Sequence, residues 1–181
     1  MPPCNRGYHT IYADPPWPEY GGGKIKRGAD RHYRLMSIKD IIALKDMVQD
    51  LAADDCHLYL WTTNNYLPDA LQVMKAWGFD YKTMITWAKN RFGLGQYYRG
   101  MTEHCLFGVK GNLPYRTLDG KRAQGVTLIQ APRREHSHKP EEMRLMIERV
   151  SHPPYIELFA RPHLNGLGLF QSQHWDFWGE E

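Results

Sequence analysis

The chain has 181 residues, 42% hydrophobic and 24% charged, which is typical of one globular domain with its own core. Its 23 Lys and Arg against 20 Asp and Glu give a net charge of only +3, too small to indicate a nucleic-acid binder by itself. No apolar run of about eighteen residues is present, and no apolar segment follows the first residues, so we expect a soluble, cytosolic protein without a signal peptide. Three scattered cysteines, Cys4, Cys56 and Cys105, predict reduced thiols.

The first expected elements are a strand, a helix and a second strand. Residues 8–13 are rich in β-branched and aromatic side chains and end at two prolines that cannot donate to a sheet. Ser37 and Asp40 form a capping box, and apolar residues at helical spacing predict one amphipathic helix as far as Leu51. A short strand is expected at 58–61.

The rest of the chain alternates between further strands and helices. We expect a helix at 68–77 ended by Gly78, a helix that begins at Pro140 and reaches Val150, and strands at 81–87, 105–109, 126–130 and 155–159. Residues 88–103 have no hydrophobic period and contain three glycines, which predicts a long mobile loop of functional importance. A single α/β domain over 1–181 follows, with both faces of its sheet covered and its ligands beyond the carboxyl ends of the strands.

Asp14-Pro15-Pro16-Trp17 lies where the active site of such a sheet is expected, at the end of the first strand. An exocyclic aromatic amine is a poor nucleophile, because its lone pair is delocalised into the ring. The Asp14 carboxylate and the Pro15 carbonyl, held by the fixed φ of Pro15 and Pro16, would accept both N–H bonds and turn that lone pair towards an electrophile. Trp17 would stack on the base. The same four residues also fit an ordinary turn followed by a core aromatic.

This tetrapeptide resembles the D-P-P-W motif of the MT-A70 family of S-adenosylmethionine-dependent adenine N(6)-methyltransferases. Further blocks follow in the order that the family has. They are Tyr33-Arg34-Leu35-Met36-Ser37, Leu60-Trp61-Thr62, Trp77-Gly78-Phe79, Thr86-Trp87-Ala88-Lys89, Glu103-His104-Cys105, Gly108-Val109-Lys110-Gly111, His138-Lys139-Pro140, Glu157-Leu158-Phe159-Ala160-Arg161 and Trp178-Gly179. The resemblance spans nearly the whole chain.

The resemblance implies a Rossmann-like methyltransferase fold with a doubly wound, mostly parallel sheet, long active-site loops and a permuted motif order. Asp14 to Trp17 would be the catalytic residues. The residues expected to bind S-adenosylmethionine are Asp14, Lys139, Glu157, Arg161, His163 and Glu180. Lys139 is also consistent with a solvated surface lysine, and Glu157 with a structural partner of an arginine. Glu180 stands where the family usually has Asn, so its role depends on an acid accepting ribose hydroxyls.

The resemblance also implies two loops beside the acceptor base. The residues expected to contact nucleic acid are Lys24, Lys26, Arg27, Tyr33, Lys89, Arg91, Arg99 and Glu103. Cations there would neutralise phosphates without reading sequence, although such runs are also typical of a solvated face. His136 and His138 have a spacing compatible with a metal, but no third ligand accompanies them, so no metal is expected.

Together these features predict methyl transfer to the 6-amino group of adenine in nucleic acid, by a monomer or homodimer. The compact chain resembles prokaryotic or phage members, which favours DNA over RNA and a cytoplasmic location. Cytosine is less favoured, because the related cytosine enzymes more often carry Ser at the position of Asp14. A non-catalytic nucleic-acid-binding subunit is the alternative from another class, and a plain nucleotide-binding protein is a third. The absence of glycine-rich phosphate motifs argues against the third.

Overall fold

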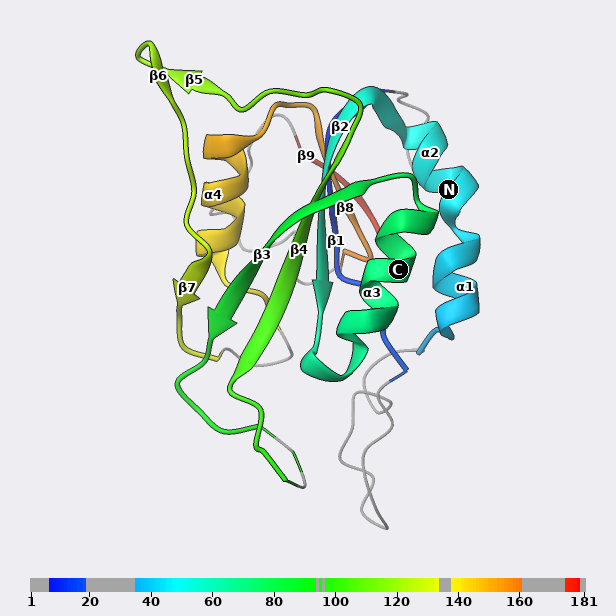
Figure 1. The fold of residues 1–181 in the computed structure, drawn as a ribbon, viewed down its shortest axis with the longest axis vertical. Coiled ribbons are helices and arrows are strands. Elements are labelled where there is room, and N and C mark those ends of the chain that lie inside the picture. The colour runs from blue at the N-terminus through cyan, green and yellow to red at the C-terminus, as the bar shows by residue number, and fades with distance from the viewer. Residues whose placement is uncertain are drawn as a thin grey trace.

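A computed structural model describes residues 7–18, 35–93, 95, 97–133, 138–160 and 175–179. They form one twisted sheet with helices on both sides (Figure 1). Its seven strands, in spatial order, are β7 (Leu128–Gln130), β3 (Asp80–Ala88), β4 (Thr102–Lys110), β2 (Ala52–Thr62), β1 (Tyr8–Ala13), β8 (Tyr155–Leu158) and β9 (Trp175–Trp178). The helices are α1 (Ile38–Ala43), α2 (Lys45–Leu51), η2 (Asn64–Tyr66), α3 (Leu67–Ala76) and α4 (Glu141–Val150).

The sheet is mixed but mostly parallel, as predicted. Strand β4 runs antiparallel to both β2 and β3, and the other neighbours pair in parallel. As predicted, a loop and no helix joins β3 to β4, so the alternation of strands and helices stops between these two strands. The loop at 89–101 returns the chain beside the strand it has just left, and an antiparallel neighbour needs no helical crossover.

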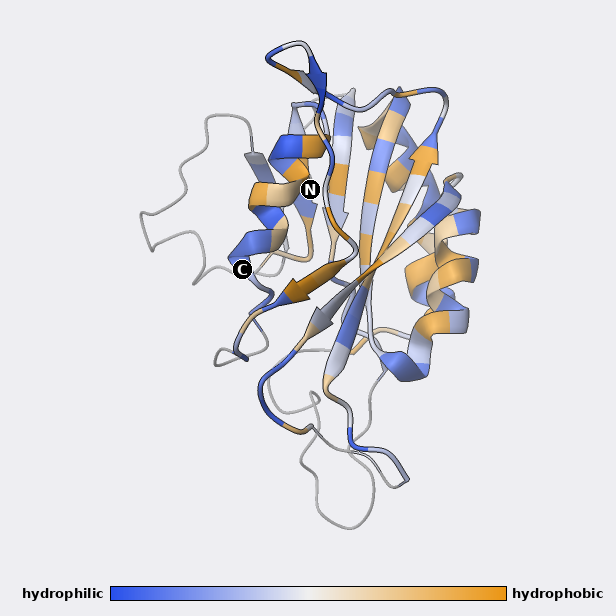
Figure 2. Cartoon of the chain, turned by 60° about the vertical axis from the view of Figure 1, so that its left-hand side comes forward, coloured by the Kyte–Doolittle hydropathy of each residue, from blue (hydrophilic) through white to orange (hydrophobic). Residues whose placement is uncertain are grey.

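Two hydrophobic cores lie on opposite faces of the sheet, and neighbouring residues of one strand contribute to different cores. In β2, Leu58 and Leu60 pack with α1, α2 and α3, whereas Tyr59 and Trp61 pack on the side of α4. Figure 2 shows the helices on the two sides of the sheet, each with both apolar and polar residues. Covering both faces explains why the central strands read as nearly continuous apolar runs.

The helix expected from Ser37 to Leu51 is interrupted. Ser37 caps it as predicted, because its Oγ accepts the Asp40 N–H at 3.2 Å and also donates to the Asp40 carboxylate at 2.7 Å. At Leu44 the backbone has ψ near 0°, so α1 ends there and α2 begins one residue later. Apolar spacing could not reveal this break, because Ile41 and Val48 stay on the core side of both helices.

The other predicted elements are present with shifted ends, and η2, β5, β6 and β9 were not predicted. The predicted strand at 58–61 starts earlier, at Ala52, and α3 ends before Gly78, which has φ +85°. The segment between β4 and β7 contains a small hairpin of β5 (Thr117–Leu118) and β6 (Lys121–Arg122), whose Asp119-Gly120 turn has positive φ at both residues. Strand β8 does not close the sheet, because β9 pairs in parallel beyond it. The four residues of β9 are too few for a visible period.

Strand β1 occupies the central position that matters for function. Its neighbour β2 is reached through α1 and α2 on one face, and its other neighbour β8 through α4 on the opposite face. The chain therefore reverses its winding at β1, and crevices at such points are the usual ligand sites of α/β sheets. Within the described residues, no helix is long and apolar enough to cross a membrane.

Candidate active site

Asp14 follows the last residue of β1, at the carboxyl edge of the sheet. Its backbone N–H approaches the carbonyl of Leu158 at 3.5 Å, which ties it to the end of β8. Its side chain extends from the face covered by α4, since Ala13 belongs to the other core and strand residues alternate. The carboxylate is therefore placed where the sequence predicted the reactive centre.

Four alternating charges meet at this edge, and we call them the charge chain: Asp14, Lys139, Glu103 and Lys89. The Lys139 ammonium donates to Asp14 Oδ2 at 2.7 Å and lies 3.3 Å from Glu103 Oε2. Glu103 Oε1 accepts a hydrogen bond from Lys89. All four side chains are only 14–20% exposed. Residues from β1, β4 and the segments after β3 and before α4 are thus brought together at one place.

Each of the two lysines of the charge chain lies over an indole ring. The Lys139 ammonium lies 5.3 Å from the ring centroid of Trp61, and the Lys89 ammonium 4.8 Å from that of Trp87. The two rings meet edge to face at 6.2 Å. Their N–H groups are satisfied inside the protein, by Tyr12 Oη at 2.7 Å and by the Ala131 carbonyl at 2.8 Å. Rings held in this way keep both cations at fixed positions.

The electrostatics of the edge follow from burial and from these pairs. Burial by itself raises the pKa of Glu103, but the charges of Lys139 and Lys89 outweigh it, so the pKa lies below its usual value and the group stays ionised. Burial raises the pKa of the Cys105 thiol, and the nearby negative charge of Asp14 adds to this effect. Cys105 and Cys56 are free, fully buried thiols, as predicted for them, and Cys4 lies outside the described residues.

The Pro15-Pro16-Trp17 segment is anchored to the protein rather than open to solvent. The Pro15 carbonyl accepts the Trp17 N–H at 2.9 Å, and the Pro16 carbonyl accepts the Met36 N–H at 2.9 Å. The Trp17 ring is 5% exposed, stacks on Tyr66 at 5.8 Å and donates to the Trp61 carbonyl at 2.9 Å. The prediction that Trp17 stacks on the substrate base is therefore wrong. The ring is a core aromatic, because it stacks on Tyr66 and its N–H is bonded to the Trp61 carbonyl.

Glu157 lies in β8 and faces α4, where its carboxylate pairs with Arg144. Burial raises the pKa of Glu157, and Arg144 opposes that shift. The guanidinium of Arg144 in turn lies over the rings of Trp175 and Phe177 at 5.2 and 5.3 Å. The structure thus places Glu157 with an arginine, the alternative considered for it, and a cofactor contact stays a prediction.

A hydrogen-bonded set of three residues at the same edge, Asn64, His104 and Thr86, was not predicted. The Asn64 Oδ1 atom lies 2.7 Å from His104 Nε2, and His104 Nδ1 lies 3.1 Å from Thr86 Oγ1. Asn64 also donates to the Thr102 carbonyl at 3.3 Å. Burial lowers the pKa of His104, against the opposite influence of Glu103. The only sequence signal was the position of His104 beside Glu103, since η2 carries no recognisable motif.

The remaining predicted site residues divide into exposed and undescribed ones. Arg91 and Arg99 are exposed on the loop between β3 and β4, and the Arg99 Nε donates to the Gly93 carbonyl at 3.0 Å. Lys89 and Glu103, expected to contact nucleic acid, lie in the charge chain, and their contact with nucleic acid stays a prediction. The residues that lie outside the described part of the chain are Lys24, Lys26, Arg27, Tyr33, His136, Arg161, His163 and Glu180. Among described residues, no group of three or more His, Cys, Asp or Glu side chains could hold a metal.

A family comparison agrees with this arrangement. The family model described as MT-A70 matches residues 8–181, which is nearly the entire chain and includes the whole charge chain. The protein belongs to the MT-A70 family. This membership confirms the predicted family and, with it, the predicted enzyme class, an adenine N(6)-methyltransferase.

Curated relatives fall into two groups by how fully they match. A type II methyltransferase, M.MunI from Mycoplasma sp, is 33% identical over 195 residues, covering 96% of this chain and 77% of that protein. The N(6)-adenosine-methyltransferase METTL3 of Danio rerio and that of Homo sapiens are each 32% identical over 165 residues. Those matches cover 86% of this chain but only 26% of the METTL3 proteins.

Proposed function

We propose that this MT-A70 protein methylates the 6-amino group of adenine in DNA, with S-adenosylmethionine as the methyl donor. The observation that carries the proposal is the position of the Asp14 carboxylate. It lies at the carboxyl end of β1, paired with Lys139 and joined through Glu103 to the loop between β3 and β4. A substrate that reached this edge would lie beside the Asp14 carboxylate, the Lys139 ammonium and the exposed cations of the loop between β3 and β4.

We infer a Rossmann-like methyltransferase fold with the permuted motif order that the resemblance implied. In support, the predicted catalytic tetrapeptide follows β1, and β1 precedes β8, where the predicted cofactor segment begins at Glu157. The two strands pair in parallel from Thr10 with Tyr155 to Ala13 with Leu158. The catalytic and cofactor segments therefore leave the sheet side by side, although they are far apart in the sequence.

The chemistry of the charge chain fits the amino-acid end of S-adenosylmethionine. That end carries one carboxylate and one ammonium, and the edge offers Lys139 to the former and Asp14 to the latter. Arg161, His163 and Glu180 are the residues we assign to the rest of the cofactor. When bound, S-adenosylmethionine supplies an electrophilic methyl group, and no metal is required by this assignment.

Asp14 and Pro15 are assigned the task of orienting the amine. Lys139 holds one oxygen of the Asp14 carboxylate, and we assign the other oxygen to an N–H of the adenine. The Pro15 carbonyl already accepts the Trp17 N–H, so its second lone pair is the one assigned to the other N–H. The main contribution is orientation, with reacting atoms roughly 3–3.5 Å apart. The amine loses its proton late, to Asp14 or to water.

We favour DNA over RNA because the match to the type II methyltransferase covers most of both proteins. The matches to the N(6)-adenosine-methyltransferases cover about a quarter of those relatives. The target adenine must be unpaired or turned out of a duplex to reach Asp14, since its amino group is inaccessible within a stacked helix.

A methylation assay with nucleoside analysis tests the proposal. Purified protein and labelled S-adenosylmethionine are incubated with single- and double-stranded DNA and RNA, and the digested nucleosides are identified by mass spectrometry. N(6)-methyladenine in DNA is the expected result. N(6)-methyladenine found only in RNA would show that the substrate is RNA and not DNA. No methylated nucleoside in any polymer, despite cofactor binding by calorimetry, would favour a non-catalytic subunit instead.

A further inference from the structure

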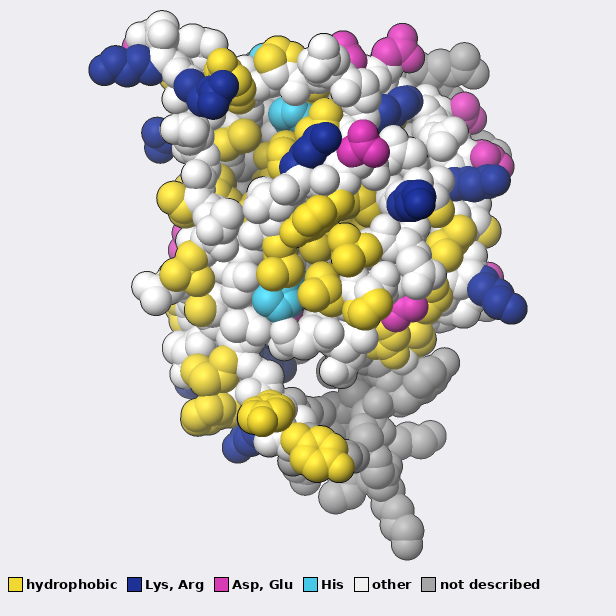
Figure 3. All heavy atoms as spheres, viewed as in Figure 1, with side chains coloured by type: hydrophobic (Ala, Val, Ile, Leu, Met, Phe, Trp, Pro, Cys, Tyr) yellow, Lys and Arg dark blue, Asp and Glu magenta, His cyan; other side chains and the backbone are white. Residues whose placement is uncertain are grey.

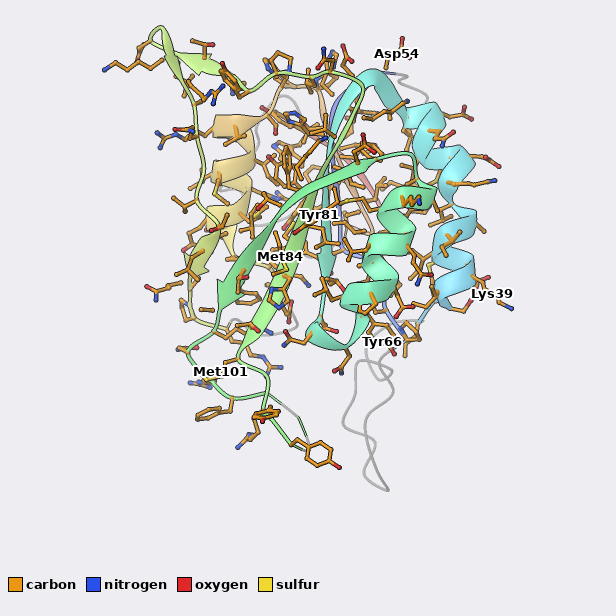
Figure 4. The ribbon with its side chains drawn as sticks, in the orientation of Figure 1. Lys39, Asp54, Tyr66, Tyr81, Met84 and Met101 are labelled. Atoms are coloured by element: carbon orange, nitrogen blue, oxygen red, sulfur yellow. The ribbon has the colours of Figure 1, made fainter. Side chains whose placement is uncertain are left out.

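The loop between β3 and β4 exposes an unusual amount of aromatic surface. Tyr97 and Tyr98 are 93% and 91% exposed, and Phe92 is 60% exposed. Figure 3 shows hydrophobic side chains gathered at the lower end of the molecule, with Lys or Arg atoms beside them. In Figure 4, Met101 marks the same end of the sheet, while Asp54 lies at the opposite end. Exposed aromatics grouped in this way usually mark a binding surface.

This loop has a defined backbone path at its stem and near its tip. The Lys89 N–H donates to the Met101 carbonyl at 2.8 Å, and the Gly93 N–H to the Gly100 carbonyl at 2.7 Å. A Cβ built on Gly95 would lie 1.9 Å from the Tyr98 carbonyl oxygen, so only glycine fits there. The hairpin therefore presents the two tyrosines in a conformation set by its backbone.

Cations accompany the aromatic rings. The Arg99 guanidinium lies 5.3 Å from the Phe92 ring centroid, and Arg91 is exposed one residue before that ring. Tyrosine rings offer a flat apolar face at a low entropic cost, and bases of any sequence can stack on such a face. Arginines beside them can bind the phosphates that link those bases. The combination is typical of a surface for unpaired nucleic acid.

The stem of the hairpin connects this surface to the reactive edge. Lys89 is the first residue after β3, and Glu103 is the second residue of β4, so both belong to the stem and to the charge chain. Glu103 in turn approaches Lys139, which holds Asp14. A DNA strand whose bases stack on the tyrosines would thus be bound to the β3–β4 hairpin, and the stem of that hairpin is linked to Asp14 through Glu103 and Lys139.

We propose that Tyr97 and Tyr98 form a stacking site for unpaired DNA bases that flank the target adenine. The site acts in addition to Asp14 and does not contact the amine. The proposal rests on the proposed function for the identity of the target. Its test is an equilibrium binding measurement without methyl transfer, so the two can fail separately.

The experiment measures fluorescence anisotropy with mixed-sequence single-stranded DNA and with the fully paired duplex, at several salt concentrations. Tyr97→Ala/Tyr98→Ala should weaken single-strand binding about tenfold or more, because stacking on each ring is lost. The slope of log K against log salt should stay the same, since no charge is removed. Tyr97→Phe/Tyr98→Phe should restore binding, because phenylalanine keeps the ring. Tyr81→Ala is the matched control, since Tyr81 is 48% exposed at the other end of β3.

Several outcomes would overturn the stacking site. These are single-strand affinity within twofold of the wild type for the alanine variant, a larger loss for duplex than for single strands, and no rescue by phenylalanine. Dissociation of a wild-type dimer by the alanine variant in sedimentation would assign the tyrosines to a contact between copies of the chain. If the wild type transfers no methyl group but the binding losses occur, the stacking site stands and the proposed function fails.

Discussion

Two polar clusters lie on the α4 side of the sheet, and they are built in different ways. The charge chain at the carboxyl edge contains four ionised groups that keep some exposure. The second cluster, which we call the neutral cluster, contains His57, Tyr59 and Ser151. His57 Nδ1 and Tyr59 Oη lie 2.7 and 2.8 Å from Ser151 Oγ, and His57 Nε2 lies 3.2 Å from the Leu113 carbonyl.

The difference in charge and burial indicates that the neutral cluster is structural, whereas the charge chain is available for chemistry. Burial lowers the pKa of His57 and raises that of Tyr59, so both stay neutral, and each has a neutral partner. Such a cluster stabilises the fold and needs nothing from outside. The charge chain instead holds ions at a partly exposed rim, where the proposed cofactor would bind. His57 and Ser151 resemble part of a hydrolase triad by residue type alone, but they are 2% and 0% exposed, so no substrate reaches them.

Replacement of Asp14 should have the largest effect. Asp14→Ala removes the acceptor for the amine, and we expect turnover to fall by more than about 10³-fold. Cofactor affinity by calorimetry should fall much less than turnover, because only the contact with the cofactor ammonium is lost, while Lys139 and the segment after β8 remain. Asp14→Asn, which keeps one acceptor atom, should lose less activity than Asp14→Ala. Wild-type turnover in Asp14→Ala would remove this residue from the mechanism.

Replacement of Glu103, which links the two lysines of the charge chain, should have the second-largest effect. Glu103→Gln leaves Lys89 and Lys139 without their shared anion, so we expect about a tenfold or greater loss of kcat and about 1–2 kcal/mol of stability. The stability loss is below that of a fully buried pair, because these side chains are 14–18% exposed. Glu142→Gln is the matched control, since Glu142 is an exposed acid of α4. Equal effects of the two changes would show that the charge chain has no special role.

The neutral cluster should respond in stability alone. Ser151→Ala leaves both His57 and Tyr59 without their common partner in a fully buried place, which should cost about 1–3 kcal/mol in urea unfolding. The kcat of the folded variant should remain that of the wild type. A loss of kcat at temperatures where the variant is folded would mean that the two clusters are coupled.

Acid should affect the two clusters in different pH ranges. The folded pKa of His57 lies below its ordinary value of 6.5, so the unfolded chain binds a proton first and stability falls as the pH drops below about 6.5. The pKa of Glu103 is also lowered, so its contribution is present above about 4.5 and is lost as the pH falls further. Urea unfolding of the wild type between pH 4 and 8 should show the first decline, and His57→Gln should reduce it. Glu103→Gln should instead reduce only the decline at the acid end.

The smallest effect is expected at the exposed arginines. Arg91→Ala should weaken DNA binding a few-fold and lower the salt slope by about one, because one phosphate contact is lost. Arg122→Ala is its control, since Arg122 is an exposed arginine in β6, at the opposite end of the sheet. An equal loss in both variants would indicate diffuse attraction without a defined contact.

Some predictions succeeded because a single local signal carried them. Ser37 and Asp40 marked the start of α1, and a continuous run of apolar and aromatic residues marked β2. The break at Leu44, the antiparallel pairing of β4 and the short β9 were not predicted, because each depends on what the segment packs against. The Asp119-Gly120 turn was a readable hairpin signal that was overlooked.

The candidate site shows the same division. Asp14 was recognised from the tetrapeptide and its position after a strand, whereas Trp17, which looked equally available, is buried against Tyr66. Lys89 and Glu103 were assigned to a phosphate-binding loop. Their true neighbours could not be inferred, because an ion pair between β3 and β4 residues depends on the antiparallel register of those strands.

The sequence by itself determined the family and the α/β class, and it predicts the residue that should hold the amine, because these depend on local order and on motifs along the chain. Only the tertiary structure decided that Asp14, Lys139, Glu103 and Lys89 form one chain of charges over Trp61 and Trp87. These residues lie as much as 125 positions apart in the sequence. A direct ion pair needs its nitrogen and oxygen within about 4 Å, so these pairs form only because the folding of β1, β3 and β4 into one sheet brings the ends of these strands together.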